Sequence, residues 1–133
     1  MNVYSIQAGN FKLDGGAMFG VVPKSLWQKT NPSDSANMID MSSRCMLIEN
    51  GNKLILVDTG MGNKQSEKFF SHYKRSGDFE LIKSINKAGF EANDITDVLL
   101  THLHFDHCGG AVVWDKSNER YDVQFKNAKY WSN

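Results

Sequence analysis

The first part of the chain contains short stretches, either alternating or continuously apolar, of the kind that form β-strands. VYSIQA, Val3 to Ala8, alternates and predicts a strand. RCMLIEN and KLILVDTG are apolar runs separated by Gly51-Asn52, which predicts a β-hairpin. Between these strands, a glycine-rich stretch predicts a turn, a short strand over Ala17 to Val22 and a loop. The polar segment from Trp27 to Ser43 is expected to be an irregular loop.

After the hairpin the apolar residues follow a helical period. Within KQSEKFFSHYKRSG the aromatic residues Phe69, Phe70 and Tyr73 stand at helical spacing, which predicts a helix there. A second helix is predicted over Phe79 to Ala88, and Gly89 is expected to end it.

The apolar run DVLLTH, Asp97 to His102, predicts a strand suited to full burial, with His102 at its C-terminal end. A third helix is expected to begin near His107, and the tail YDVQFKNAKYW predicts one or two strands around a turn. The predicted elements follow the order strands, a pair of helices, a strand that bears histidines, and further strand. This order indicates an α/β or α+β fold with helices on at least one sheet face.

Composition and charge narrow the function classes. The 133 residues are 41% hydrophobic and 23% charged, close to the average for globular proteins, and fifteen basic residues balance fifteen acidic ones. The balanced charge therefore gives the chain no net electrostatic attraction to nucleic acid or to an anionic membrane. The sequence shows neither a signal-peptide pattern nor an apolar run near the roughly 20 residues of a spanning helix. We expect a cytoplasmic protein, with Cys45 and Cys108 as reduced thiols.

Three of the four histidines lie within THLHFDHCGG, Thr101 to Gly110. Imidazole and carboxylate are the usual nitrogen and oxygen ligands of zinc and related metals. In extended backbone His102 and His104 point to one side and could bind one ion, while a turn would direct Asp106 and His107 towards a second. The two glycines that end the segment permit a close bend. As core residues, these histidines would cost about 1–3 kcal/mol for each unsatisfied ring nitrogen, which favours a metal site.

THLHFDHCGG resembles the HxHxDH signature of the metallo-β-lactamase superfamily. LVDTGMG resembles the strand-Asp-x-Gly motif that precedes this signature in the family, and the order of hairpin, helices and histidine strand agrees. The resemblance covers most of the chain, Val3 to Trp131. It implies an αββα sandwich with a site at one edge of two packed sheets.

The resemblance also assigns roles to individual residues. It implies that His102 and His104 bind metal 1, that Asp106 and His107 bind metal 2, and that Asp58 stands behind them and orients a ligand. Two divalent ions are implied, with zinc favoured and iron or manganese as alternatives. Asp106 is predicted to be the proton shuttle as well as a ligand.

Two such ions supply an activated water and polarise a carbonyl oxygen. The resemblance therefore implies hydrolysis of a small lactone, ester, thioester or amide, with lactonase-like chemistry matching the layout best. The alternative is a catalytically silent ligand-binding or interaction module of the same fold.

The chain departs from the family pattern after the signature. Family members add two further histidines and a bridging aspartate downstream, whereas no histidine follows His107 here and the later acidic residues are Asp115, Glu119 and Asp122. We therefore expect residues 1–133 to be the N-terminal part of a single metallo-β-lactamase-like domain, inactive by itself. Unpaired sheet surface in such a part is expected to favour association, including homo-oligomers.

Overall fold

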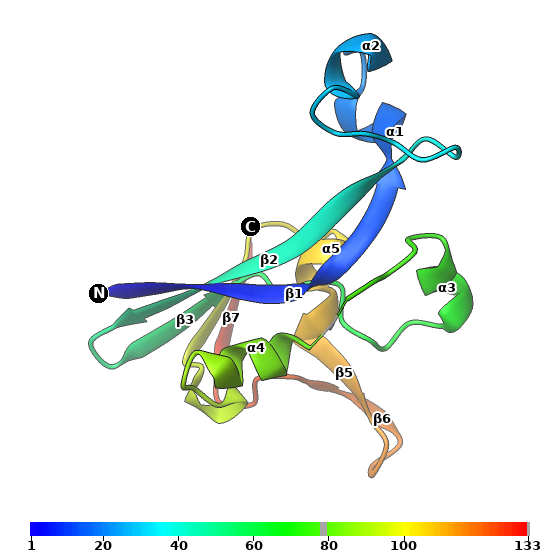
Figure 1. The fold of residues 1–133 in the computed structure, drawn as a ribbon. Coiled ribbons are helices and arrows are strands. Elements are labelled where there is room, and N and C mark those ends of the chain that lie inside the picture. Colours follow the sequence, from blue (N-terminus) through cyan, green and yellow to red (C-terminus); the bar gives the residue numbers. More distant parts are fainter. Residues whose placement is uncertain (78–79, 133) are drawn as a thin grey trace.

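A five-stranded sheet organises the protein in the computed structural model, which describes residues 1–77 and 80–132 (Figure 1). Its strand order is β1-β2-β3-β4-β7, and β5 and β6 form a separate antiparallel pair. The strands are β1 (Asn2–Asp14), β2 (Met38–Asn50), β3 (Lys53–Val57), β4 (Asp97–Leu100), β5 (Val112–Asp115), β6 (Arg120–Val123) and β7 (Lys129–Ser132). The helices are α1 (Gly15–Phe19), α2 (Lys24–Trp27), α3 (Glu67–Ser71), α4 (Leu81–Lys87) and α5 (Phe105–Cys108), with 3₁₀ turns at Ala92–Asp94 and Gly109–Ala111. The α+β class is confirmed.

The predicted hairpin is present between β2 and β3. The two strands pair antiparallel from Asn50 opposite Lys53 to Met46 opposite Val57. Gly51 has a φ of 60°, the left-handed conformation that a two-residue hairpin turn requires. β4 and β7 then add in parallel, so the carboxyl ends of β3, β4 and β7 lie at one edge of the sheet.

The strand predicted over Val3 to Ala8 is longer than expected. β1 continues to Asp14 and pairs with residues 38–42, so β2 begins inside the segment that was expected to be an irregular loop. Figure 1 shows this part of β1 and β2 as an arm that extends away from the sheet and carries α1 and α2 at its tip. The loop prediction is therefore wrong from Met38 onward, because pairing with β1 orders the polar residues there.

The short strand predicted over Ala17 to Val22 is also wrong. The Asp14 side chain accepts a hydrogen bond from the Ala17 backbone N–H (2.8 Å), which caps α1 and favours helix. Phe19 stacks on Trp27 of α2 with 5.0 Å between ring centroids. The glycine-rich stretch thus forms the small packed tip of the arm.

The predicted helices are present but shorter. α3 covers one turn, with the Ser66 hydroxyl accepting from the Phe69 N–H. α4 begins at Leu81, and the predicted start at Phe79 lies outside the described residues. α5 begins at Phe105, two residues before the predicted start. β6 and β7 confirm the strands predicted in the tail, whereas β5 was not predicted.

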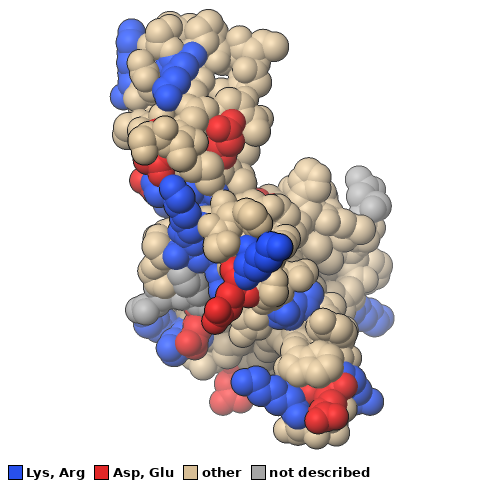
Figure 2. All heavy atoms as spheres, turned by 90° about the vertical axis from the view of Figure 1, so that its right-hand side faces the viewer, with Lys and Arg blue, Asp and Glu red and all other residues tan. Residues whose placement is uncertain are grey.

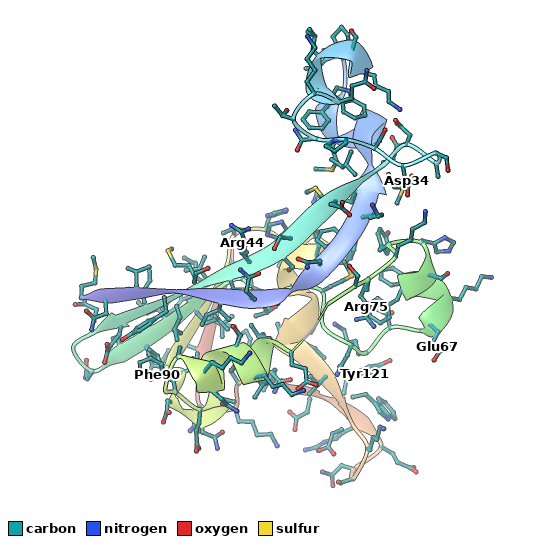
Figure 3. All side chains as sticks on the ribbon, in the orientation of Figure 1. Asp34, Arg44, Glu67, Arg75, Phe90 and Tyr121 are labelled. Atoms are coloured by element: carbon teal, nitrogen blue, oxygen red, sulfur yellow. The ribbon has the colours of Figure 1, made fainter. Side chains whose placement is uncertain are left out.

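The main core lies on one face of the sheet, under α4. Ile85 of α4 is fully buried, and it packs in a cluster with Leu47, Leu56 and Val98 of the central strands. Phe90, labelled in Figure 3, meets the ring of Tyr4 edge-on, with 5.4 Å between centroids. This face of the sheet is therefore covered as expected for a sheet flanked by helices.

The opposite face carries an apolar row across four strands. Met46, Val57, Leu99 and Trp131 are successive register partners on β2, β3, β4 and β7. Met46 is 41% exposed, Leu99 is 42% exposed and Trp131 is 52% exposed. Association through this surface stays a prediction. The described helices are all too short to cross a bilayer, and the longest, α4, has seven residues.

Acid sensitivity is expected to arise from Asp97 at the start of β4. The Lys53 ammonium (2.9 Å), the Thr96 hydroxyl and the Trp131 indole N–H lower the pKa of Asp97 to about 2. Because this pKa lies below that of the unfolded chain, its contribution to stability is present above about pH 4 and is lost as the pH falls towards 2.

Urea unfolding at pH 6 and at pH 3 measures this contribution. Asp97→Asn is expected to be less stable than wild type at pH 6 and to lose less stability on acidification. Asp40→Asn, at an exposed carboxylate paired with Lys12, is the control and should follow the wild type. Equal losses in wild type and Asp97→Asn would contradict the assignment.

Candidate metal centre

Asp58 and Thr101 follow the ends of two neighbouring parallel strands. β3 and β4 pair with Val57 opposite Leu99, so the next residues lie together at the same sheet edge. The Thr101 backbone N–H donates to Asp58 Oδ1 (2.8 Å). Asp58 has a φ of 60°, a conformation that Asp adopts more readily than most residues, and its own N–H donates to the Leu99 carbonyl (2.9 Å). The sheet therefore fixes the carboxylate at the edge where the histidine segment begins.

Backbone contacts hold the histidine segment against the loop that follows β3. The Gly110 N–H donates to the Gly60 carbonyl (3.0 Å). A Cβ at Gly110 would lie 2.2 Å from the Thr59 carbonyl oxygen, and one at Gly109 would lie 2.1 Å from the Met61 carbonyl oxygen. Both positions therefore require glycine, as the close bend predicted at these residues implies.

Alanine at Gly110 is expected to destabilise the fold by at least about 2–3 kcal/mol, which lowers Tm by roughly 10 °C. The added Cβ would push the histidine segment off the Thr59 carbonyl, and the neighbour is backbone that cannot rotate away. Thermal unfolding followed by circular dichroism measures this loss.

Gly51→Ala is the matched control, because a Cβ there meets nothing within 4 Å and the cost comes only from its positive φ. That cost is expected to be about 1 kcal/mol. Similar melting temperatures for the two variants would contradict the close approach at Gly110.

The three histidine rings of the segment lie next to one another. The ring centroids of His102 and His104 are 4.6 Å apart, and those of His102 and His107 are 4.0 Å apart. β4 ends at Leu100, so the prediction that His102 ends the strand is wrong by two residues. His107 lies within α5. This helix provides the turn that was predicted between the pair His102 and His104 and the pair Asp106 and His107.

Asp58 contacts the last histidine of the segment. His107 Nδ1 lies 2.8 Å from Asp58 Oδ2. Burial raises the pKa of Asp58, but hydrogen bonds from His107 and Thr101 lower it, and the pKa is below its ordinary value. An ionised carboxylate only accepts, so Nδ1 of His107 is the donor, and in the neutral ring Nε2 keeps its lone pair. Such a carboxylate–histidine pair is typical of metal ligands.

The donor types of the segment fit a divalent metal ion, although they do not complete a site. His107 Nε2 lies 3.6 Å from Oδ2 of Asp106, and imidazole and carboxylate are both zinc ligands. Over residues 1–77 and 80–132, no three His, Cys, Asp or Glu side chains form a group that could hold a metal ion. The segment therefore offers donors that need rearrangement or further ligands.

An aromatic cluster flanks the segment. Phe105 packs against Phe69 and Tyr73 of the α3 region, with ring centroids 5.4 Å and 4.5 Å away. Arg75, labelled in Figure 3, lies 3.3 Å from the ring centroid of Phe70 and donates to a backbone carbonyl. These contacts hold the α3 region beside the histidine segment.

A small cavity opens beside the segment. Its volume is about 180 Å³, and it is lined in part by Met41 and Arg44 of β2 and by Asp58, Asp106 and His107. Ligand pockets for drug-sized molecules measure about 300–1,000 Å³, so this cavity has room only for a small chemical group.

His72 lies apart from this arrangement of donors, whereas Cys45 lines the small cavity and Cys108 directly follows His107 in α5. His72 is exposed at the C-terminal cap of α3. Cys45 and Cys108 are free thiols, as predicted. Burial, together with the nearby Asp58 charge, raises the pKa of Cys45 to about 12, so this thiol stays protonated.

Comparison with known proteins decides the family. The family model described as the metallo-beta-lactamase superfamily matches residues 38–118, more than half of the chain. The chain belongs to the metallo-β-lactamase superfamily. The matched region runs from the start of β2 through Asp58 and the HxHxDH signature to the β5–β6 turn.

Individual metallo-β-lactamase relatives agree in fold. A probable metal-dependent hydrolase from Staphylococcus aureus has a TM-score of 0.86 and 35% identity, covering 97% of this chain and 45% of its own. AidC, a dizinc quorum-quenching lactonase solved with a product, has a TM-score of 0.68 and 32% identity, covering 96% and 40%. An N-acyl homoserine lactonase from Bacillus sp is 30% identical over 83 residues, 55% of this chain.

The chain spans about a third of the curated lactonase that it matches and less than half of these two solved chains. That residues 1–133 form the N-terminal part of one domain stays a prediction.

Thr101 is the site residue that sequence reasoning did not identify. Its hydroxyl lies within 3.1 Å of both the Asp58 carboxylate and His102 Nδ1. The only signal in the sequence is its place directly before the signature, next to the end of an apolar strand. Recognising its role requires the parallel register of β3 and β4.

Proposed function

We propose that this chain supplies the metal-binding segment of a metal-dependent hydrolase that acts on a small carbonyl substrate, with lactones as the favoured class. The observation that carries the proposal is the arrangement of three adjacent imidazoles and Asp106 beside the Asp58–His107 pair, in a member of the metallo-β-lactamase superfamily. The similarity to lactonases favours lactones among carbonyl substrates.

The proposed metal ligands are His102, His104, Asp106 and His107, with zinc as the favoured ion. Two divalent ions, when bound, would supply an activated water and polarise the substrate carbonyl. Asp58 keeps the proton of His107 on Nδ1, which leaves Nε2 as the donor nitrogen. Asp58 therefore acts by orienting a ligand.

Asp106 is proposed to move the proton as well as to bind metal. Its side chain is 18% exposed, and Oδ2 lies 3.6 Å from His107 Nε2. A carboxylate at this place can take a proton from the attacking water and return it to the leaving oxygen of the opened ring. Phe105 and its aromatic neighbours would provide apolar surface next to the reacting group.

The charge distribution does not favour a polyanionic substrate. Figure 2 shows basic and acidic side chains intermingled over the visible face, and the whole chain has no net charge. A polyanionic substrate such as nucleic acid is usually bound by a continuous basic surface.

The test measures zinc content and ring opening of a panel of N-acyl homoserine lactones and nitrophenyl esters. The natural full-length protein is compared with its His102→Ala and Asp106→Asn variants. We expect turnover in the wild type that depends on zinc and is lost in both variants. Equal turnover in wild type and variants would overturn the proposal.

A catalytically silent ligand-binding or interaction module is the second candidate. It is favoured by the finding that the described residues bring no three potential ligands together as a metal-binding group. Absence of turnover of every panel member in the folded protein, with or without bound zinc, would support this candidate over the hydrolase.

A further inference from the structure

The Thr101 hydroxyl lies between a carboxylate and an imidazole. Thr101 Oγ1 is 2.9 Å from Oδ2 and 3.0 Å from Oδ1 of Asp58, and it is 3.1 Å from Nδ1 of His102. The Thr101 backbone N–H also donates to Asp58 Oδ1 (2.8 Å). The carboxylate that contacts His107 directly is thus linked to His102 through one hydroxyl.

The number of protons that each group can donate determines the direction of these hydrogen bonds. A threonine hydroxyl has one proton to donate, and an ionised carboxylate has none. If the hydroxyl donated to His102, its oxygen would face both Asp58 oxygens at 2.9–3.0 Å without a proton between them. The hydroxyl therefore donates to Asp58, and its lone pair accepts the Nδ1–H of His102.

We propose that Thr101 is a positioning residue that holds neutral His102 in the tautomer with the proton on Nδ1 and the lone pair on Nε2. Asp58 then sets the tautomers of two imidazoles, His107 by direct contact and His102 through Thr101. The inference rests on the proposed function only in naming the metal ion that Nε2 of His102 and Nε2 of His107 would bind.

This arrangement gives a single carboxylate control over both halves of the proposed site. His102 and His107 are the ligands expected at different ions, and their ring centroids are 4.0 Å apart. Without the hydroxyl, His102 would lose its orienting partner and either ring nitrogen could carry the proton. Loss of a group that orients a metal ligand typically costs about 10–100-fold in metal affinity.

The experiment reads the tautomer directly in the metal-free protein. Long-range proton–nitrogen NMR spectra of protein labelled with ¹⁵N-histidine are recorded at about pH 8, where imidazole is mostly neutral. We expect His102 to show a protonated Nδ1 and an unprotonated Nε2 in wild type and in Thr101→Ser. Exposed His72 serves as the internal reference for an unconstrained ring.

Thr101→Val removes the hydroxyl at nearly constant shape. In this variant His102 is expected to populate the tautomer protonated on Nε2, while His107, still held by Asp58, keeps its Nδ1 proton. Zinc affinity, measured by competition with a chelating dye, is expected to fall about 10–100-fold in Thr101→Val and to stay near wild type in Thr101→Ser.

The outcomes separate this inference from the proposed function. A wild-type His102 protonated on Nε2 would overturn the inference without reference to any variant. An unchanged His102 tautomer in folded Thr101→Val would also overturn it. The expected tautomers in a protein that neither binds zinc nor hydrolyses any substrate would support the role of Thr101 and overturn the proposed function.

Discussion

Alanine at His104 or His107 is expected to lower the zinc affinity of the protein by at least about 100-fold, more than the loss of an orienting group alone. Each change removes an imidazole from the cluster in which His102 lies 4.6 Å from one ring and 4.0 Å from the other. Zinc competition titrations at pH 7.5 measure the affinity, and circular dichroism checks that each variant is folded.

His72→Ala is the matched control for these variants. His72 is the histidine outside the signature and is exposed at the end of α3. Its replacement is expected to leave zinc affinity within about twofold of wild type, since an exposed side chain away from the donors has no part in binding. An equal loss for His72→Ala and His107→Ala would show that binding is not confined to the signature.

Replacing Asp58 is expected to damage both stability and metal binding. In Asp58→Ala the Thr101 N–H, the Thr101 hydroxyl and His107 Nδ1 all lose their shared partner. Thr101 is exposed and the His107 side chain is 36% exposed, so water replaces part of these hydrogen bonds, and we expect a loss of about 2 kcal/mol in the free energy of unfolding. Zinc affinity should fall by roughly 100-fold.

Asp58→Asn separates the two effects. Asparagine keeps the size of the side chain and tolerates the positive φ at this position, so stability should fall less than in Asp58→Ala. Its amide presents donors as well as an acceptor, so it no longer fixes the proton of His107 on Nδ1. Urea unfolding and zinc titration are the measurements. Zinc affinity near wild type in Asp58→Asn would contradict an orienting role for the carboxylate.

Structural features that depend only on residues close together in the chain could be predicted from local sequence patterns. The Gly51-Asn52 hairpin is present because both strands and their turn lie within about twenty residues of sequence. The bend at Gly109 and Gly110 could be predicted because glycine is the residue type that permits close backbone approach. His102 and His104 lie side by side, as the alternation of extended backbone predicted, although β4 itself ends at Leu100.

Features that depend on distant contacts were missed or placed wrongly. The polar residues at the start of β2 form strand because residues 10–14 lie opposite them in the arm. α1 replaces the predicted strand because the Asp14 cap competes successfully with the β-type pattern of the residues that follow. The role of Thr101 depends on parallel pairing between strands about forty residues apart, which periodicity does not reveal.

Anomalous diffraction from crystals of the zinc-loaded protein, collected on both sides of the zinc absorption edge, tests the metal site most directly. We expect zinc peaks about 2.0–2.2 Å from imidazole nitrogens of His102, His104 and His107 and from an oxygen of Asp106. Zinc bound elsewhere, or no peak at these side chains in crystals grown with saturating zinc, would show that they do not form the metal site.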